Sequence, residues 1–338
     1  MKINEVFKVN LDIDLFNDII GQSKTKKQLL SALIMNRHLI VVGYPGVGKT
    51  TLAKNVAKLL PEITVSDCGF NCTPQNPICP KCINKKSKQI KIKGEKRFVR
   101  VQGSPDLTVE DLIGDIDPIK ALQFGPLSIE AFTPGKIFKA NNGVLFFDEI
   151  NRAPEKLQNA LLQVLEEGRV TIGSYDVDLT SEFILISTMN PEDFAGTEKL
   201  SEVFLDRFDI ITMDYPENIE VEEKIIKAKG EKLKEVSFDQ ELILLTLKFI
   251  KSLRDNKDLE RAPSVRASLG LYERAQSNAL VNKRKKVQIE DIIESIQSVL
   301  SHRIKLKASL RYTIKPEEYL RQEFKRFIEE ADKSGDYP

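Results

Sequence analysis

A chain of 338 residues is long enough for two domains of about 150 residues each. Apolar residues make up 41% of the chain and charged residues 30%, and 51 basic residues offset 50 acidic ones to leave a net charge of +1. This composition is typical of a globular protein, and it excludes collagen-like, low-complexity and disordered chains. The near-neutral charge argues against a dedicated nucleic-acid binder.

Membrane insertion and secretion are not indicated. No apolar run approaches the roughly 18 residues that a membrane span needs, and residues 1–14 lack the apolar core of a signal peptide. We therefore expect a cytoplasmic protein with no membrane association. The chain has 2 histidines, His38 and His302, which excludes a His-rich metal site.

The first part of the chain alternates helical patterns with short apolar runs. Runs typical of buried parallel strands occupy residues 39–42, 144–147, 183–187 and 210–213. Helical periodicity is found over residues 24–35, 50–60 and 155–167. Alternation around Gly173 and Ser174 predicts a β-hairpin over residues 169–179. Together these patterns predict an α/β domain with a parallel sheet over residues 1–215.

The remainder of the chain reads as helical. Residues 215–218 have the composition of a linker, and helical patterns follow over residues 220–234, 240–254, 265–281, 290–306 and 316–332. We therefore expect a second, all-helical domain over residues 216–338.

A phosphate-binding loop lies between the first predicted strand and its helix. Residues 43–50 match the pattern G-x-x-x-x-G-K-[ST], in which glycines let backbone amides converge on phosphate oxygens. Lys49 would reach the β- and γ-phosphates, and the Thr50 hydroxyl would bind Mg²⁺. The candidate nucleotide-binding residues are Gly43, Pro45, Gly46, Val47, Gly48, Lys49, Thr50 and Thr51.

Two carboxylates follow the apolar run over residues 144–147. Asp148 would stand at the end of a parallel strand beside the phosphate loop, where it can hold Mg²⁺. Glu149 is placed to polarise an attacking water, which hydrolysis requires and nucleotide binding alone does not. An acidic pair after a strand is more often a solvated loop, but its combination with the phosphate loop favours catalysis.

Two further polar residues have open interpretations. Asn190 ends the next apolar run and could position the attacking water, or it could simply form a turn before Pro191. Arg207 could act as an arginine finger, or it could form a surface ion pair with Asp206.

The ordered set of motifs resembles an AAA+ ATPase of the MoxR and magnesium-chelatase I-subunit branch. Residues 43–50 resemble Walker A, residues 144–149 resemble Walker B, and Asn190 falls where sensor 1 would lie. Residues 148–154 and 103–107 are similar to MoxR proteins, and residues 116–122, 132–137 and 140–143 to the chelatase subunit. Residues 262–267 and 299–303 resemble the lid, and the resemblance covers about residues 15–305.

This resemblance implies an αβα P-loop core followed by a helical lid, assembled into a ring, usually a hexamer, with nucleotide between neighbouring subunits. Arg207 would act on the neighbour's nucleotide, and Arg266 would be a sensor 2 cation near the γ-phosphate; a plain lid-surface arginine is the alternative. Residues 118–134 correspond to the helix-2 insert and residues 169–179 to the pre-sensor-1 hairpin. Family members usually work with a partner that carries a von Willebrand A domain. The mixed signature leaves the subfamily open, and it does not imply porphyrin binding.

The function that these features favour is hydrolysis of ATP to remodel a partner protein. A nucleic-acid motor of the same clade is the alternative, and a switch that binds nucleotide without hydrolysing it is a third. Glu149, Asn190 and Arg207 argue against the switch.

All four cysteines fall in a predicted insertion over residues 64–98. The spacing of Cys68, Cys72, Cys79 and Cys82 is within the range of structural zinc sites, and a cytoplasmic chain keeps thiols reduced. We expect a structural Zn²⁺ ion; an iron–sulfur cluster, a pair of disulfides and four ordinary thiols are the alternatives.

A basic run follows the cysteines. Residues 85–100 hold 8 Lys and Arg residues and the single acid Glu95. The run favours the solvated face of a strand, and a basic surface for a partner or nucleic acid is the alternative.

Overall fold

The computed structural model describes residues 3, 5–8, 15–84, 87–125, 128–172, 175–191 and 200–334. The chain divides into two compact units. The first, the core unit, comprises Met1–Ile19, Ser23–Gly43 and Gly48–Met213. The second, the helical unit, comprises Ile20–Gln22, Tyr44–Val47 and Asp214–Pro338. Among the described residues, no helix combines the length and the apolar character that crossing a membrane requires.

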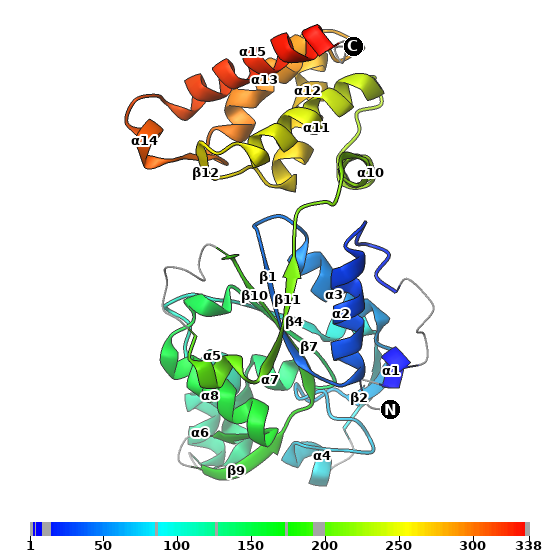
Figure 1. The fold of residues 1–338 in the computed structure, drawn as a ribbon. Coiled ribbons are helices and arrows are strands. Elements are labelled where there is room, and N and C mark those ends of the chain that lie inside the picture. Colours follow the sequence, from blue (N-terminus) through cyan, green and yellow to red (C-terminus); the bar gives the residue numbers. More distant parts are fainter. Residues whose placement is uncertain are drawn as a thin grey trace. The chain divides into compact units, whose positions relative to one another are not determined.

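The core unit is built on a five-stranded sheet. Its strands are β1 (His38–Gly43), β4 (Phe98–Gln102), β7 (Gly143–Asp148), β10 (Phe183–Met189) and β11 (Phe208–Met213). They stand in the order β11-β1-β10-β7-β4, and every neighbouring pair is parallel (Figure 1). The predicted α/β class and parallel sheet are therefore confirmed. We call the edge at which these strands begin the amino edge, and the edge at which they end the carboxyl edge.

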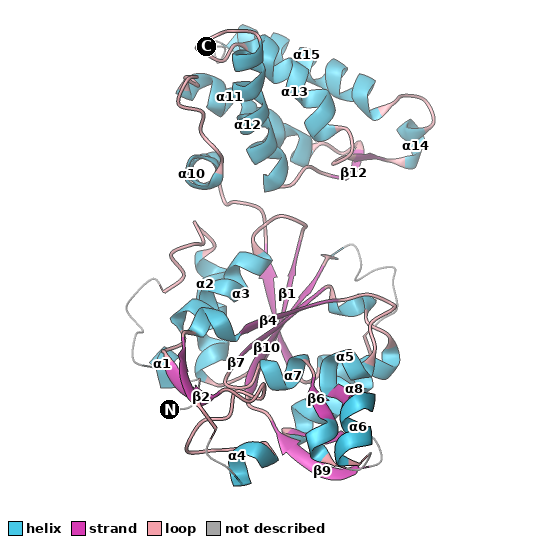
Figure 2. Ribbon diagram, turned by 180° about the vertical axis from the view of Figure 1, so that it is seen from behind, coloured by secondary structure: helices cyan, strands magenta, loops and turns pink. Residues whose placement is uncertain are grey.

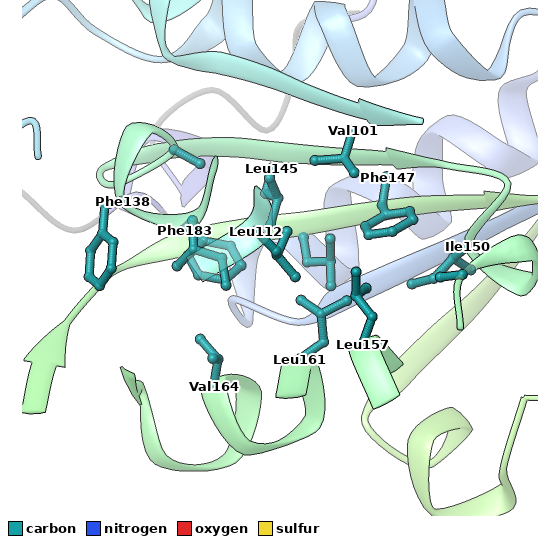
Figure 3. Close-up of a cluster of buried hydrophobic side chains, with 14 of the residues drawn as sticks. Val101, Leu112, Phe138, Leu145, Phe147, Ile150, Leu157, Leu161, Val164 and Phe183 are labelled. Atoms are coloured by element: carbon teal, nitrogen blue, oxygen red, sulfur yellow. The ribbon is translucent and has the colours of Figure 1, made fainter. Parts of the chain in front are cut away.

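Helices cover both faces of this sheet. On one face lie α2 (Ser23–Ile34) and α3 (Lys49–Leu59), and on the other lie α5 (Val109–Ile113), α7 (Lys136–Lys139) and α8 (Glu155–Glu167). Figure 3 shows Leu145 and Phe147 of β7 pointing toward Leu157 and Leu161 of α8. Successive residues of a strand point to opposite faces of the sheet, so Val144 and Phe146 point to the other face. Both are also fully buried.

The core unit also contains short two-stranded antiparallel ribbons that are separate from the main sheet. One pairs β2 (Ile63–Ser66) with β3 (Gln89–Ile92), with α4 (Pro80–Asn84) between them. A second pairs β5 (Gly114–Ile116) with β6 (Phe132–Pro134) around α6 (Pro118–Phe124). The third pairs β8 (Arg169–Ile172) with β9 (Tyr175–Thr180), which confirms the predicted hairpin. Its turn residues Gly173 and Ser174 lie outside the described residues. The remaining short helices are α1 (Glu5–Lys8) and α9 (Glu202–Leu205).

The helical unit holds most of the predicted helices. The predicted ones are α10 (Ile219–Lys229), α11 (Gln240–Asp255), α12 (Val265–Val281), α13 (Ile289–Leu300) and α15 (Pro316–Ser334). The short helix α14 (Ala308–Arg311) was not predicted, and the two short strands β12 (Leu259–Arg261) and β13 (Lys305–Leu306) pair antiparallel (Figure 2).

Two of these helices are shorter than predicted. α10 ends before Gly230, whose amide donates a hydrogen bond to the Ile226 carbonyl. Position 230 has no room for a side chain, because a Cβ there would lie too close to the Tyr272 ring. α13 ends at Leu300 because the chain turns there and continues into the β12–β13 pairing.

Candidate nucleotide site

The strand register gathers the candidate residues at the carboxyl edge. Val42 of β1 pairs with Met189 of β10, and Ser187 of β10 pairs with Phe147 of β7. The segments that follow these three strands therefore leave the sheet side by side. They are the predicted phosphate loop, the acidic pair and the segment that begins with Asn190. In open parallel sheets this edge is where ligands bind.

The phosphate loop requires glycine at several positions. A side chain at Gly43 would place its Cβ 2.3 Å from the carbonyl oxygen of Met213 on the neighbouring strand. Gly46 and Gly48 have φ angles of 82° and 109°, in the left-handed region that other residues rarely adopt. Lys49 donates a hydrogen bond to the Gly43 carbonyl, so its ammonium group lies within the curve of the loop.

Helix α3 begins directly after this loop. Lys49, Thr50 and Thr51 form its first turn, whose backbone amides have no partner within the helix. Gly48 precedes the helix without a capping side chain, and no acidic residue occupies the first turn. The positive end of the helix dipole therefore favours an anion at this position.

Asp148 is held from two sides. The Thr188 hydroxyl donates to Asp148 Oδ1 at 2.6 Å, and Arg100 Nη2 of β4 lies 2.6 Å from Asp148 Oδ2. The side chain of Asp148 is 17% exposed, so the carboxylate keeps access to the carboxyl edge. A fixed carboxylate oxygen at the carboxyl edge, where the phosphate loop also lies, fits the oxygen ligands that Mg²⁺ prefers.

Glu149 has an unusual backbone conformation. Its φ and ψ angles are 56° and 57°, which is the left-handed region, and its amide donates to the Thr188 hydroxyl at 2.9 Å. The carboxylate accepts a hydrogen bond from Gln102 Nε2 at 3.3 Å and lies 3.2 Å from Arg152 Nη1. Left-handed non-glycine residues are costly and cluster at functional sites.

Asn190 has an unused acceptor. It follows β10 directly, and within the described residues its Oδ1 atom is buried without a hydrogen-bond donor. A buried, unpaired amide oxygen at the carboxyl edge needs a polar partner. Such an oxygen fits the predicted contact with the attacking water molecule.

Arg207 lies at the other end of the sheet. It precedes β11, whose first residue, Phe208, pairs with His38 at the start of β1. The length of β1 therefore separates Arg207 from Gly43 by about 17 Å, at about 3.3 Å per residue. Its guanidinium pairs with Glu166 of α8, with Nε 2.9 Å from Oε1, and with Asp206 at 3.1 Å. The Glu166 carboxylate, its first partner, raises the pKa of Arg207.

Arg266 belongs to the helical unit. It lies in the first turn of α12 and is exposed. Its Cγ is 2.9 Å from the position that a Cβ on Gly46 would take, and both residues belong to the same compact unit. Arg266 is therefore beside the tip of the phosphate loop, and glycine at position 46 leaves room for it.

The four cysteines come together away from these residues. The Sγ atoms of Cys68, Cys72, Cys79 and Cys82 lie within 4.8 Å of one another, in the segment between β2 and β3. None of them forms a disulfide.

Three residues of the site were missed by sequence reasoning. Thr188 connects the acidic pair, and Arg100 and Gln102 contact the two carboxylates. Alternation over residues 98–102 was the available signal, since Arg100 and Gln102 point one way and Val99 and Val101 the other.

The basic run also differs from the expectation of one solvated face. Lys91 and Lys93 are exposed on and beside β3, but Arg97 is 2% exposed and donates to the carbonyls of Pro61 and Asn142. Burial lowers the pKa of Arg97 to about 10. Lys85 and Lys86 lie outside the described residues.

Models of three protein families match the chain. They are described as "ATPase family associated with various cellular activities (AAA)", over residues 75–210, "Magnesium chelatase, subunit ChlI", over residues 15–90, and "AAA lid domain", over residues 256–322.

Full-length relatives agree with these matches. The "Magnesium-chelatase subunit ChlI homolog" of Methanocaldococcus jannaschii is 31% identical over 325 residues, which cover 86% of this chain and 86% of that protein. The "Chaperone MoxR1" of Mycobacterium tuberculosis is 28% identical, over 85% of this chain and 73% of that protein. Among solved structures, a RuvB mutant of Thermotoga maritima has a similar fold, with a TM-score of 0.50 and 19% identity over 84% of this chain and 72% of that one.

Proposed function

This chain belongs to the AAA+ ATPase family of magnesium-chelatase ChlI subunits and MoxR proteins, and we propose that it hydrolyses ATP to remodel a partner protein. The observation that carries the proposal is the convergence of the phosphate loop, Asp148, Glu149 and Asn190 at one edge of the sheet. A site that only binds nucleotide needs the loop, whereas hydrolysis also needs a base and a group that positions water.

Each residue has a chemical task in this proposal. The loop amides and Lys49 bind the phosphates, and Thr50 and Asp148 hold Mg²⁺, which when bound neutralises phosphate charge. Glu149 accepts the proton of the attacking water. Asn190 offers its buried Oδ1 to that water and so fixes the direction of attack.

The position of Arg207 supports a ring. A cation about 17 Å from its own phosphate loop cannot neutralise charge there, but a neighbouring subunit can receive it. We therefore assign Arg207 to the nucleotide of the next subunit, in a homo-oligomeric ring for which the family resemblance favours a hexamer. Arg266, beside Gly46, is assigned to the γ-phosphate of its own chain.

The hydrolysis proposal is tested with Glu149→Gln. Assembled wild-type protein should turn over ATP in the presence of Mg²⁺, and Glu149→Gln should bind ATP with little change but lose turnover. Glu167→Gln makes the same chemical change at an exposed position at the end of α8 and should leave the rate unaltered. Absence of turnover in assembled wild type would instead favour a nucleotide-dependent switch.

The remodelling proposal is tested by capture with the Glu149→Gln protein. With ATP bound, we expect it to retain a partner that carries a von Willebrand A domain, and the capture should be lost with ADP. Recovery of DNA alone, or ATPase stimulation by DNA that salt suppresses, would instead establish a nucleic-acid motor. The nucleic-acid alternative has less support, because two arginines of the basic run already contact groups of the same chain. Arg97 binds backbone carbonyls, and Arg100 pairs with Asp148.

A further inference from the structure

The cysteine cluster has the dimensions of a site for one metal ion. Its four sulfur atoms lie within 4.8 Å of one another. Around a tetrahedral ion with metal–sulfur bonds of about 2.3 Å, sulfur atoms are about 3.8 Å apart. A multi-iron cluster is larger than one ion and holds its thiolates further apart. Disulfides would join the sulfurs in pairs, and all four thiols are free.

Two backbone amides are directed at the sulfur of Cys72. The amides of Ile78 and Cys79 donate to Cys72 Sγ at 3.3 and 3.4 Å. Such donors stabilise negative charge on sulfur. Neutral thiols do not need them, whereas four adjoining thiolates need both these donors and a cation between them.

The cluster is closed. Cys72 is fully buried and Cys79 is 2% exposed, while Cys68 and Cys82 are half-buried. Four cysteines fill the coordination sphere of a tetrahedral ion and leave no position for a substrate. An ion held in this way stabilises structure and does not perform catalysis.

The segment that carries the cysteines has few other means to fold. Between β2 and β3 its described apolar residues that are buried besides cysteine are Phe70 and Ile78. So small an apolar contribution does not offset the entropy of ordering a loop of this length. Metal binding supplies that free energy in small cysteine-rich segments.

Phe70 connects the cluster to the ribbon β5–β6. Phe70 lies between Cys68 and Cys72 in sequence. The centroid of its ring is 6.2 Å from that of Phe132 of β6 and 5.3 Å from that of Phe138 of α7. Gly69 is so close to Pro134, the last residue of β6, that an added Cβ would be 3.3 Å from its Cγ. The cysteine segment therefore packs against the base of the insert over residues 118–134.

Hydrogen bonds join the same segment to the start of β7. Asn141 Nδ2 donates to the Phe70 carbonyl at 3.0 Å, and Asn71 Nδ2 donates to the Lys139 carbonyl at 2.7 Å. Residues 139–141 precede β7 at the amino edge, whereas Asp148 ends it at the carboxyl edge. The length of β7, about 17 Å at about 3.3 Å per residue, separates these contacts from the nucleotide residues.

We propose that Cys68, Cys72, Cys79 and Cys82 together bind one Zn²⁺ ion. The bound ion would keep Phe70 and Gly69 packed against the β5–β6 ribbon and so stabilise that ribbon, an effect that we call the brace. Zinc is the divalent ion that a closed tetrahedral set of four thiolates favours. The brace fixes the base of the insert over residues 118–134, which follows β5 and ends with β6.

The metal content of the full-length protein tests the site. Purified wild type, dialysed against a weak chelator and measured by mass spectrometry, should retain one zinc per chain. Lys81→Ala, an exposed change between two of the cysteines, should retain it as well, and Cys79→Ser with Cys82→Ser should lose it. Wild type without zinc, or with iron in its place, overturns the proposal. Should the double variant fail to fold, thiolate-to-cobalt absorption in wild type reconstituted with Co²⁺ gives an independent answer, and its absence contradicts the site.

Hydrogen exchange tests the brace separately. Removal of zinc from wild type with a strong chelator should accelerate amide exchange in residues 67–84 and also in residues 114–116 and 132–134. Exchange in α11 of the helical unit should not change. If zinc leaves and the exchange of residues 132–134 stays as it was, the ion does not brace the ribbon.

Discussion

A single hydroxyl organises the acidic pair at the residue scale. Thr188 donates to Asp148 and accepts from the amide of Glu149, so one side chain fixes both the carboxylate beside the phosphate loop and the backbone of the base. Arg100 and Gln102 then hold the outer oxygens of the two carboxylates. The geometry of the pair thus depends on residues from the two strands that flank β7, β4 and β10.

Replacement of Thr188 by valine should slow hydrolysis. The variant keeps the shape of the side chain but leaves Asp148 Oδ1 and the Glu149 amide without their partner, so we expect kcat to fall roughly 10- to 100-fold, as for other residues that orient metal ligands. Steady-state ATPase assays and ATP-binding titrations measure the two effects separately. Thr246→Val removes a buried hydroxyl from α11 and should leave kcat unchanged. Equal rates for Thr188→Val and wild type would contradict the assignment.

At the element scale, sequence periodicity predicts where helices and strands lie, whereas strand topology determines which of their residues meet. The bounds of α8 and α12 follow from long amphipathic patterns, and four mostly apolar runs identify β1, β7, β10 and β11. β4 was not delimited, because it is an edge strand whose alternating polar residues fall within a basic run. The phosphate loop and acidic pair could be predicted from local motifs. Thr188 and Arg100 could not, because their roles depend on strand register, which no local pattern encodes.

The strand topology predicts complementation between two inactive variants. Arg207→Ala has an intact acidic pair but supplies no arginine to its neighbour, and Glu149→Gln supplies the arginine but cannot hydrolyse. Arginine fingers contribute about 10³–10⁵ in rate, so each variant alone should be nearly inactive. A mixture should recover part of the wild-type rate in an ATPase assay, because some interfaces combine one functional half from each chain. No recovery in co-assembled mixtures would show that Arg207 acts elsewhere.

Arg37→Ala is the matched control for that experiment. Arg37 is another exposed arginine at the amino edge, paired with Asp209 at 3.1 Å. Its loss should leave the rate of the assembled protein near that of wild type.

At the scale of the whole molecule, the proposed function divides one reaction between the two edges of the sheet. The carboxyl edge offers the phosphate loop and the acidic pair, and the amino edge offers Arg207. The length of β1 separates them within one chain. If the proposed role of Arg207 holds, activity belongs to an assembly, and the affinity between subunits limits it.

Specific activity should for this reason depend on protein concentration. We expect the rate per chain to rise with concentration and to level off when sedimentation shows complete assembly. Dilution should reverse the effect within the time that subunits need to dissociate. A rate per chain that is constant across the range in which rings dissociate would mean that the monomer is catalytically complete.

The left-handed backbone of Glu149 lowers the stability of the fold at a residue that the proposed hydrolysis requires. A non-glycine residue in this conformation costs about 1–2 kcal/mol, which glycine would not incur. Glu149→Gly should therefore unfold at a higher temperature than Glu149→Ala, although both lack the carboxylate and neither should turn over ATP. Random mutation selected only for thermal stability would then drift toward glycine here and, on the proposed function, abolish hydrolysis. The left-handed turn at Glu149 is in that case a thermodynamic cost of the reaction.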